Sequence, residues 1–242
     1  NTREHCLPAL AENSAVMAGA RILEIDGGEA SKTLAVAERL WNELLEGGAG
    51  RNSLLVNLGG GTVTDLGGFV AAGFKRGISY INIPTTLMGQ CDAAIGGKTA
   101  VNAGMIKNQV GFFYAARAVF LYPGFLETLP AGQFRSGLAE MIKCALVGDE
   151  KRWRRILRHP VSGLMNMPRG KGFLEDLLSG TVRYKTRIVA RDYREHKLRK
   201  VLNFGHTMGH AMETYSLMNS REPLLHGEAV AAGMVCALYL SA

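Results

Sequence analysis

The sequence predicts an α/β domain with a parallel sheet, followed by an all-α domain. Short apolar runs alternate with helical patterns up to about residue 130, which is typical of a parallel sheet covered by helices. Beyond that point only helical patterns remain. Of the 242 residues, 47% are hydrophobic and 20% charged, so the chain can bury a sizeable core.

The expected elements of the first half follow one another at short intervals. Apolar spacing predicts a helix over residues 31–45, which Gly47 and Gly48 end. Residues 53–58 read as a buried strand, and a glycine turn leads into a helix over 63–72. Two more strands are expected over 79–83 and 118–121, each ended by a proline-containing turn.

The second half is expected to consist of helices over 133–147, 172–191, 207–217 and 227–241. We therefore place a domain boundary near Pro130, between an α/β domain of residues 1–130 and a helical domain of residues 131–242. The chain ends inside an apolar helix without a cap, so we expect it to be cut at this end.

Composition and charge narrow the function classes. The apolar run 229–240 is too short to span a bilayer, and four widely spaced cysteines favour a reducing cytoplasm over a disulfide framework. Residues 151–200 hold 15 Lys or Arg against 4 Asp or Glu, within a chain of net charge +7. A small anionic substrate explains this stretch better than nucleic acid, because its few aromatic residues, Trp153, Phe173, Tyr184 and Tyr193, do not follow the pattern of a nucleic-acid-binding module. A solvated helical face is the simpler alternative.

Residues 59–61 form a triple-glycine turn between a predicted strand and helix. Backbone N–H groups at such a helix start can cradle a phosphate, but a tight structural turn is an equally good interpretation. Thr64 stands where the G-x-G-x-x-G pattern has its last glycine. Asp65 could reach a ribose hydroxyl or cap its helix. Thr85 and Thr86 follow the next strand, at the sheet edge where ligands bind.

A second glycine turn, Gly96-Gly97, precedes Lys98, and Lys107 and Asn108 follow shortly after. Two ammonium groups and an amide suit a phosphate or carboxylate, whereas the plain alternative is a polar loop. The string is not a P-loop, since the upstream glycine is missing.

Glutamate and histidine residues in the second half suggest a metal site. His206 and His210 are four apart on a predicted helix, His226 opens the last one, and Glu140 lies among apolar neighbours. Three such ligands and an open position describe a catalytic zinc site, although any one histidine alone is more often a structural group. Cations and an amide lie near these residues in the sequence: Lys143 follows Glu140 by three residues, and Arg199, Lys200 and Asn203 shortly precede His206.

Taken together, these motifs resemble the 3-dehydroquinate synthase family. The matching strings run in order through nearly the whole chain: 27–32, 59–61 with Asp65, 68–71, 83–87, 96–99, 107–108, 137–140 with Lys143, 202–207 with His210, and 225–228. The resemblance implies a Rossmann-like NAD-binding domain, a helical domain and a site between them. It also implies a homodimer that uses NAD and one divalent metal, zinc or cobalt, without a nucleic-acid or membrane partner.

The implied reaction turns 3-deoxy-D-arabino-heptulosonate 7-phosphate into 3-dehydroquinate and phosphate. It runs through transient oxidation, phosphate elimination, reduction and aldol closure. The family pattern assigns the metal to Glu140, His206 and His226. It assigns catalysis and substrate binding to Lys98, Asn108, Lys143, Lys185, Arg199, Asn203, His210 and, across a dimer interface, Arg76. It assigns NAD contacts to Glu29, Lys32, Gly60, Gly61, Asp65, Thr85, Thr86, Asp92, Lys107, Phe125 and Thr128.

The chain departs from the family pattern at Thr64 and Ala100, each in place of a glycine, and family members extend beyond both of its ends. Related cyclases that act on sedoheptulose phosphate typically lack the second histidine, so His210 favours dehydroquinate synthase. The alternatives are another sugar phosphate cyclase, a metal-dependent polyol dehydrogenase that releases NADH, and a non-catalytic binding module.

Overall fold

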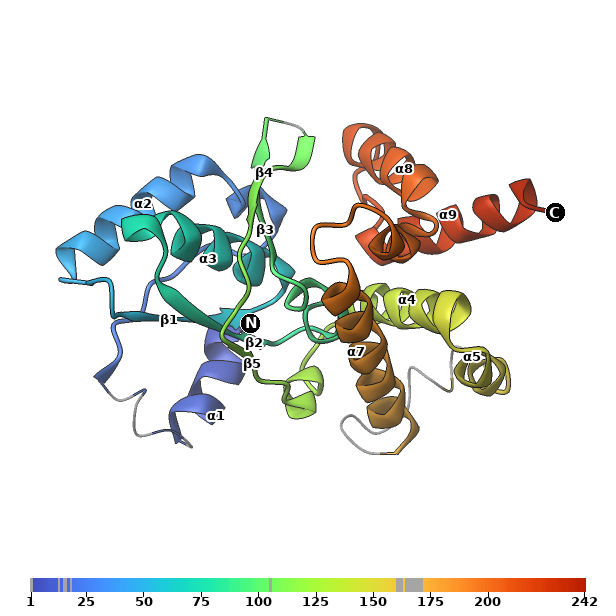
Figure 1. Cartoon of the computed structure of the whole chain (residues 1–242), viewed down its shortest axis with the longest axis horizontal. Coiled ribbons are helices and arrows are strands. Elements are labelled where there is room, and N and C mark those ends of the chain that lie inside the picture. Colours follow the sequence, from blue (N-terminus) through green and yellow to red (C-terminus); the bar gives the residue numbers. More distant parts are fainter. Residues whose placement is uncertain are drawn as a thin grey trace. The chain divides into compact units, whose positions relative to one another are not determined.

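The structure is a computed structural model that describes residues 2–12, 14, 17, 19–104, 106–159, 163 and 172–242 (Figure 1). The chain divides into two compact units. The first comprises Asn1–Thr85 and Ala93–Phe125, and the second comprises Thr86–Asp92 and Leu126–Ala242. The predicted order, a parallel α/β region followed by a helical region, is confirmed.

A three-stranded parallel sheet in the order β1-β2-β5 organises the first unit. Strand β1 (Leu54–Gly59) pairs along its whole length with β2 (Ser79–Pro84), and the crossover between them is helix α3 (Gly61–Gly73). Helix α2 (Leu34–Glu46) begins at Thr33, whose side chain accepts a hydrogen bond from the Val36 amide, and packs on α3. A short helix α1 (Leu7–Glu12) was not predicted.

Strand β5 (Ala118–Val119) is shorter than the predicted 118–121. It lies at the sheet edge with β2 as its neighbour in the sheet, and a turn at Pro123–Leu126 follows soon after. The structure also contains a hairpin that the sequence interpretation did not include. Strands β3 (Lys98–Ala103) and β4 (Ile106–Phe113) pair antiparallel, with an irregular register near Ala103, where we had expected a polar loop or an anion-binding loop.

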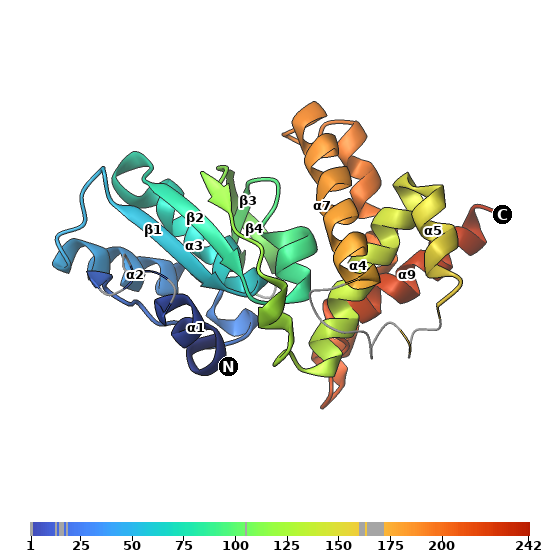
Figure 2. The same ribbon diagram turned by 90° about the horizontal axis from the view of Figure 1, so that it is seen from below.

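The second unit is built around α4 (Ala131–Gly148), which contacts α5 (Glu150–Ile156), α7 (Phe173–Arg191) and α9 (His226–Leu240). Figure 2 shows α7 and α9 on either side of α4. Helix α8 (His206–Asn219) packs along α9, and a 3₁₀ segment (Leu198–Asn203) precedes it. The four predicted helices are confirmed to within a few residues, and α5 is additional.

The core of the second unit is an apolar cluster that joins α4 and α7. Phe134, Leu138 and Met141 of α4 pack there with Leu174 and Leu177 of α7. This packing fixes the face of α4 that carries Glu140. In the described part of the chain, no helix is both long and apolar enough to cross a membrane.

Candidate metal centre and anion-binding residues

Helices α4, α8 and α9 bring together the glutamate and histidine residues that the sequence singles out. Glu140 lies in the middle of α4. His206 is the first residue of α8, and His226 is the first residue of α9. Both histidines therefore lie at the N-terminal ends of their helices. His210 follows His206 by one turn on α8.

The helices meet at glycines, where their backbones approach closely. A Cβ at Gly227 would lie 2.0 Å from the carbonyl oxygen of Ser136, and a Cβ at Gly233 would lie 2.0 Å from that of Gly205. The Gly227 amide also donates a buried hydrogen bond of 2.9 Å to the Ser136 hydroxyl. Since Gly227 follows His226, and Ser136 lies one turn before Glu140, this crossing sets the separation of the two side chains.

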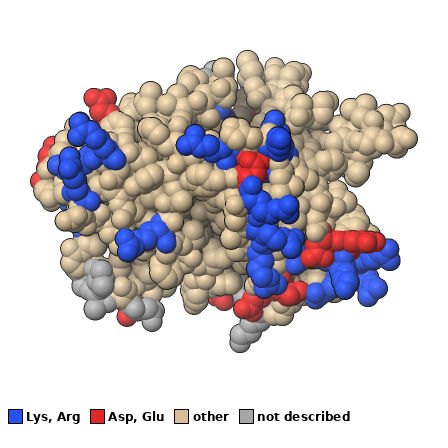
Figure 3. Space-filling view, viewed as in Figure 1, with Lys and Arg blue, Asp and Glu red and all other residues tan. Residues whose placement is uncertain are grey.

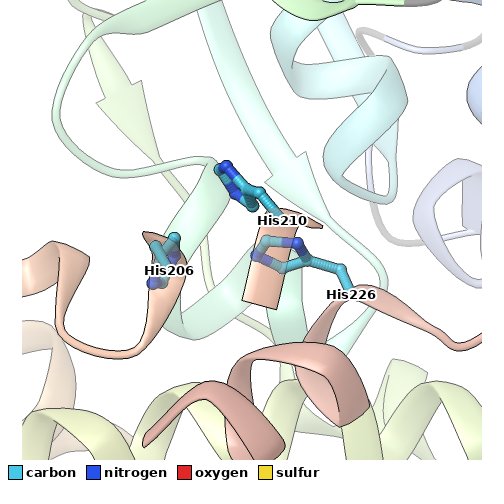
Figure 4. Close-up of side chains that lie close together, drawn as sticks. All are labelled: His206, His210 and His226. Carbon is cyan, nitrogen blue, oxygen red and sulfur yellow. The ribbon is translucent and has the colours of Figure 1, made fainter. Parts of the chain in front are cut away.

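The side chains converge on one oxygen. Nε2 of His206 lies 3.7 Å, and Nε2 of His226 3.8 Å, from Oε1 of Glu140. Figure 4 shows the three imidazoles gathered, two from α8 and one from the start of α9. Their ring centroids are 5.3 to 5.5 Å apart, and one ring nitrogen of each lies within 4.8 Å of the others.

Glu140 distinguishes between two possible ligand sets. Its side chain is 0% exposed; Oε2 accepts a hydrogen bond from Lys143, whereas Oε1 has no hydrogen-bond partner. A buried carboxylate oxygen without a donor is costly, and a cation is the partner that removes the cost. His210, by contrast, is exposed. Glu140, His206 and His226 therefore suit a divalent cation better than the three histidines do.

The protonation state of His206 fits this role. Burial, followed by the charge of Lys143, lowers the pKa of His206 to about 4, so its ring is neutral at pH 7 as a metal ligand must be. Burial alone would lower the pKa of Lys143, but the carboxylates of Glu140 and Asp92 outweigh it and raise that pKa. Lys143 therefore remains a cation although it is only 1% exposed.

Two further cations of the second unit, Lys185 and Arg199, are buried and donate hydrogen bonds to protein groups. The Lys185 ammonium donates to the Asp92 carboxylate at 2.5 Å and to the Asp92 carbonyl oxygen at 2.6 Å. Arg199, 2% exposed, donates to the carbonyl oxygen of Tyr193 and forms an ion pair with Glu195. Glu195 also accepts from the amide of Asn203 at 2.7 Å. Sequence reasoning missed Glu195, which nothing in the local pattern separates from an ordinary surface glutamate.

Asp192 shapes the turn that carries Arg199. Its carboxylate accepts hydrogen bonds from the backbone amides of His196, Lys197 and Arg199, at 2.9, 2.7 and 3.0 Å. Together these donors, with the Arg199 amide first, lower the pKa of Asp192 to about 2.

The sequence left open whether the basic stretch 151–200 is a solvated face or binds an anion. In the structure this stretch contains both exposed and buried cations. Figure 3 shows Lys and Arg side chains over α5 and α7 with Asp and Glu among them. Exposed pairs such as Arg154–Glu150 and Arg155–Asp176 form an ordinary solvated face. Lys185 and Arg199 are instead held inside the unit, so the stretch is not uniform in role.

In the first unit, Gly60 and Gly61 lead from β1 into α3, with Gly60 as the residue before the first turn. A Cβ at Gly61 would approach that of Ala93 to 3.3 Å. Thr64, which departs from the family pattern, is buried and donates its hydroxyl proton to the carbonyl oxygen of Gly61 at 3.0 Å. Backbone amides at the start of a helix such as α3 can donate to an anion.

A polar network lies beside α3. The buried Lys32 ammonium donates to Asp65 at 2.6 Å and to the side chain of Asn108, and Glu29 lies 3.8 Å away. Asn102, which sequence reasoning missed, donates to Glu29 and accepts from the Asn108 amide, both at 3.0 Å. The family pattern groups Asn108 with substrate-binding residues, but in the structure its side chain accepts a hydrogen bond from Lys32, which also donates to Asp65.

The remaining predicted residues are spread over the two units. Lys98 is exposed and begins β3, and Lys107 is half-buried on β4. Arg76 is exposed at a positive φ of 69°, beyond α3. Buried Thr85 follows β2, and Thr86 accepts a hydrogen bond from the Gly89 amide. Phe125 is buried and Thr128 exposed, on either side of the boundary between the two units.

The fold and this geometry define the class of protein: a parallel α/β unit with a glycine turn, joined to a helical unit with a candidate divalent-metal centre. The chain belongs to the 3-dehydroquinate synthase family. Residues 22–136 match the model of the family's N-terminal region, and residues 137–242 match that of its C-terminal region.

Curated relatives carry the same family name. The chain is 47% identical over 241 residues to the 3-dehydroquinate synthase of Parabacteroides distasonis, which covers all of this chain and 66% of the relative. It is 46% identical over 214 residues to that of Dichelobacter nodosus, covering 88% of this chain and 56% of the relative. The chain therefore spans less than two thirds of the length of these relatives.

Solved structures share the fold. A 2-epi-5-epi-valiolone synthase from Streptomyces hygroscopicus, with NAD⁺ and Zn²⁺ bound, is 34% identical with a TM-score of 0.78, over 87% of this chain and 57% of that one. A 2-deoxy-scyllo-inosose synthase in complex with carbaglucose-6-phosphate, NAD⁺ and Co²⁺ is 30% identical with a TM-score of 0.74, over 89% and 57%. A glycerol dehydrogenase from Schizosaccharomyces pombe, 16% identical with a TM-score of 0.60, shares the fold alone.

Proposed function

We propose that this chain carries the active-site residues of a 3-dehydroquinate synthase, which converts 3-deoxy-D-arabino-heptulosonate 7-phosphate to 3-dehydroquinate and phosphate. The observation that supports this most strongly is the buried Oε1 of Glu140, which lacks a hydrogen-bond partner and faces Nε2 of both His206 and His226. Family membership and the bound NAD⁺ and metal ions of the solved relatives point the same way.

Glu140, His206 and His226 would hold one zinc or cobalt ion, with the fourth position open to substrate. When bound, such an ion polarises a substrate oxygen, and NAD accepts and later returns a hydride. Lys143 donates to Oε2 of Glu140, so it would orient the carboxylate and offset its charge.

NAD would bind to the first unit. The amides of Gly60 and Gly61, where β1 leads into α3, suit its pyrophosphate, and Asp65 suits a ribose hydroxyl. Lys32 holds Asp65 in place, Glu29 lies 3.8 Å from the Lys32 ammonium, and Asn102 in turn donates a hydrogen bond to Glu29. We assign the remaining NAD contacts to Thr85, Thr86, Asp92, Lys107, Phe125 and Thr128. Residues 1–130 would thus bind the cofactor, and residues 131–242 the metal and the substrate.

The substrate carries a carboxylate and a phosphate, and the chain offers fixed cations for both. Lys185 and Arg199 are anchored by Asp92 and Glu195, so they would meet an anion without first losing side-chain freedom. Lys98, Lys143 and His210, together with the neutral amides of Asn108 and Asn203, would complete the substrate contacts. Oriented cations stabilise the charge that develops on phosphate as it leaves.

We also propose that the protein acts in the cytoplasm as a homodimer. Arg76 supports the dimer: it is exposed, beside a glycine turn, at a position that the family pattern assigns to a neighbouring subunit's site. Light scattering of the wild type and of Arg76→Ala, each with an activity measurement, tests this. Loss of activity in an unchanged dimer is the expected result.

The decisive assay is phosphate release from the heptulosonate phosphate with catalytic NAD, after chelation and then with zinc restored. Metal-dependent phosphate release without accumulating NADH is expected. Accumulating NADH would instead indicate a polyol dehydrogenase, and no release in the presence of bound NAD and metal would contradict the proposal.

Variants connect the assay to the site. His206→Ala is expected to abolish both zinc binding and phosphate release, because it removes one of three ligands. His196→Ala is the matched control, since the His196 side chain is exposed and its described hydrogen bond comes from the backbone amide. Equal zinc affinity in the two variants would exclude this site.

A further inference from the structure

Glu213 is a buried carboxylate that the proposed chemistry does not use. It lies on α8, one turn beyond His210, and is 5% exposed. Its Oε2 lies 3.1 Å from Nδ1 of His226, the first residue of α9. A carboxylate inside a helical unit needs a hydrogen-bond donor, and His226 supplies one.

This contact determines which nitrogen of His226 carries the proton. An ionised carboxylate can only accept hydrogen bonds, so the neutral His226 ring must carry its proton on Nδ1. Nε2 is then left with its lone pair, and Nε2 is the atom that lies 3.8 Å from Oε1 of Glu140. The hydrogen bond also fixes the rotation of the ring.

A hydrogen bond also fixes the ring of His206, but its partner is a backbone carbonyl group. Its Nδ1 lies 3.3 Å from the carbonyl oxygen of Phe204, an acceptor, so its Nε2 is again the nitrogen presented to Glu140. Both histidines thus turn the same ring atom to the same oxygen. A backbone carbonyl group orients His206, whereas a side chain, Glu213, orients His226 and can be removed by mutation.

We propose that Glu213 is a positioning residue of the metal centre: it holds His226 as the Nδ1-protonated tautomer with Nε2 directed at the metal position. The proposal rests on the proposed function, because it needs a metal at Glu140, His206 and His226. Carboxylate or carbonyl partners of histidine ligands orient the ring and raise its basicity, and their loss typically weakens metal binding roughly 10- to 100-fold.

The test compares Glu213→Ala and Glu213→Gln with Glu222→Ala, a control whose side chain lies on the exposed connection before α9. Zinc affinity is measured by competition with a chelator, and ligand geometry from the visible absorption of the cobalt-loaded protein. Glu213→Ala is expected to weaken zinc binding roughly 10- to 100-fold and to alter the cobalt spectrum. Glu213→Gln keeps an acceptor oxygen but not the charge, so a smaller loss is expected.

A second readout needs no metal. Burial lowers the pKa of His226, but the hydrogen bond to Glu213 and the nearby carboxylates outweigh it and raise that pKa, so the spectrum is recorded at a pH high enough to keep the ring neutral. Nitrogen-15 NMR of the metal-free protein then reports the tautomer of His226, with Nδ1–H expected in the wild type and a mixture in Glu213→Ala. A wild-type ring protonated on Nε2 alone would overturn the proposal. So would a Glu213→Ala protein with lower thermal stability but unchanged zinc affinity and cobalt spectrum, because that result describes a structural role.

Failure of the inference can be told apart from failure of the proposed function. If His226→Ala abolishes zinc binding while Glu213→Ala leaves it unchanged, the metal centre stands and the role of Glu213 falls. If the wild type and His206→Ala bind zinc equally weakly, the metal centre itself falls, and the role of Glu213 falls with it.

Discussion

The crossing of α4 and α9 at Gly227 should control both the stability of the helical unit and its affinity for metal. In Gly227→Ala the new Cβ would lie 2.0 Å from the Ser136 carbonyl oxygen, where an ordinary contact begins at 3.4 Å. The backbones must therefore separate by about 1.4 Å, or the helices must rotate, since neither partner is a flexible side chain. The hydrogen bond between Gly227 and the Ser136 hydroxyl is strained by the same motion.

Overpacking of this kind costs about 3 kcal/mol when backbone has to move. For a chain of this size that corresponds to a fall in Tm of about 6–12 °C. The same displacement acts on the site, because His226 adjoins Gly227 and Nε2 of His226 lies 3.8 Å from Oε1 of Glu140. Metal–ligand distances tolerate only about 0.2 Å, so zinc affinity should fall at least roughly tenfold.

The assay is thermal unfolding of the metal-free protein, followed by zinc titration against a competing chelator. Gly132→Ala is the matched control within α4. Its Cβ would meet the flexible ends of two side chains, Leu225 at 3.2 Å and Arg135 at 3.7 Å, and alanine favours a helix over glycine. An unchanged Tm and zinc affinity in Gly227→Ala would refute the view that this crossing is tightly packed and sets the ligand spacing.

Three further results are expected. Lys185→Met leaves the partly buried Asp92 carboxylate without its ammonium partner and should cost about 2 kcal/mol in unfolding free energy, whereas Lys185→Arg should cost less; equal losses would show that the charge pair is unimportant. Burial raises the pKa of the Cys144 thiol to about 12, so native-state alkylation followed by mass spectrometry should modify the partly exposed Cys236 and spare Cys144. The pKa of Asp192 is lowered to about 2 in the folded state, so its stabilising effect is present above about pH 4 and is lost as the pH falls toward 2. The stability difference between wild type and Asp192→Asn should therefore shrink between pH 6 and pH 2, and a difference that persists at pH 2 would contradict this.

Elements with a buried apolar face could be predicted from the sequence. Strand β1 and helices α3, α4 and α9 carry long apolar patterns, and each lies within a few residues of its expected position. The β3–β4 hairpin could not be predicted in the same way. Most of β4 is exposed and includes a glycine, so its residues show neither the alternation of a half-buried strand nor a turn signal of the usual kind.

The candidate site shows the same division. His206, His210 and His226 stand out because histidine is scarce in this chain, and Glu140 stands out because its neighbours are apolar. Glu213 could have been found, since it follows His210 by three residues and so shares a helix face with it. Glu195 and Asn102 could not, because their partners are distant in the sequence or are reached through a turn that no local pattern marks.

Asn108 shows why position in a motif does not fix a role. Its neighbour Lys107 and the string beginning at Gly96 suggest a single anion-binding segment. In the structure, β3 and β4 fold back on each other, so Asn108 comes to lie on the Lys32 side chain, 76 residues away, with its own amide bonded to Asn102. Asn108 also adopts a positive φ of 58°, a conformation that asparagine tolerates better than most residues. The hairpin therefore selects asparagine here partly for its backbone, and the amide side chain that results is used to brace the Lys32–Asp65 pair. A residue such as Asn108 contributes to a site by holding the charged side chains in position, whichever ligand those side chains bind.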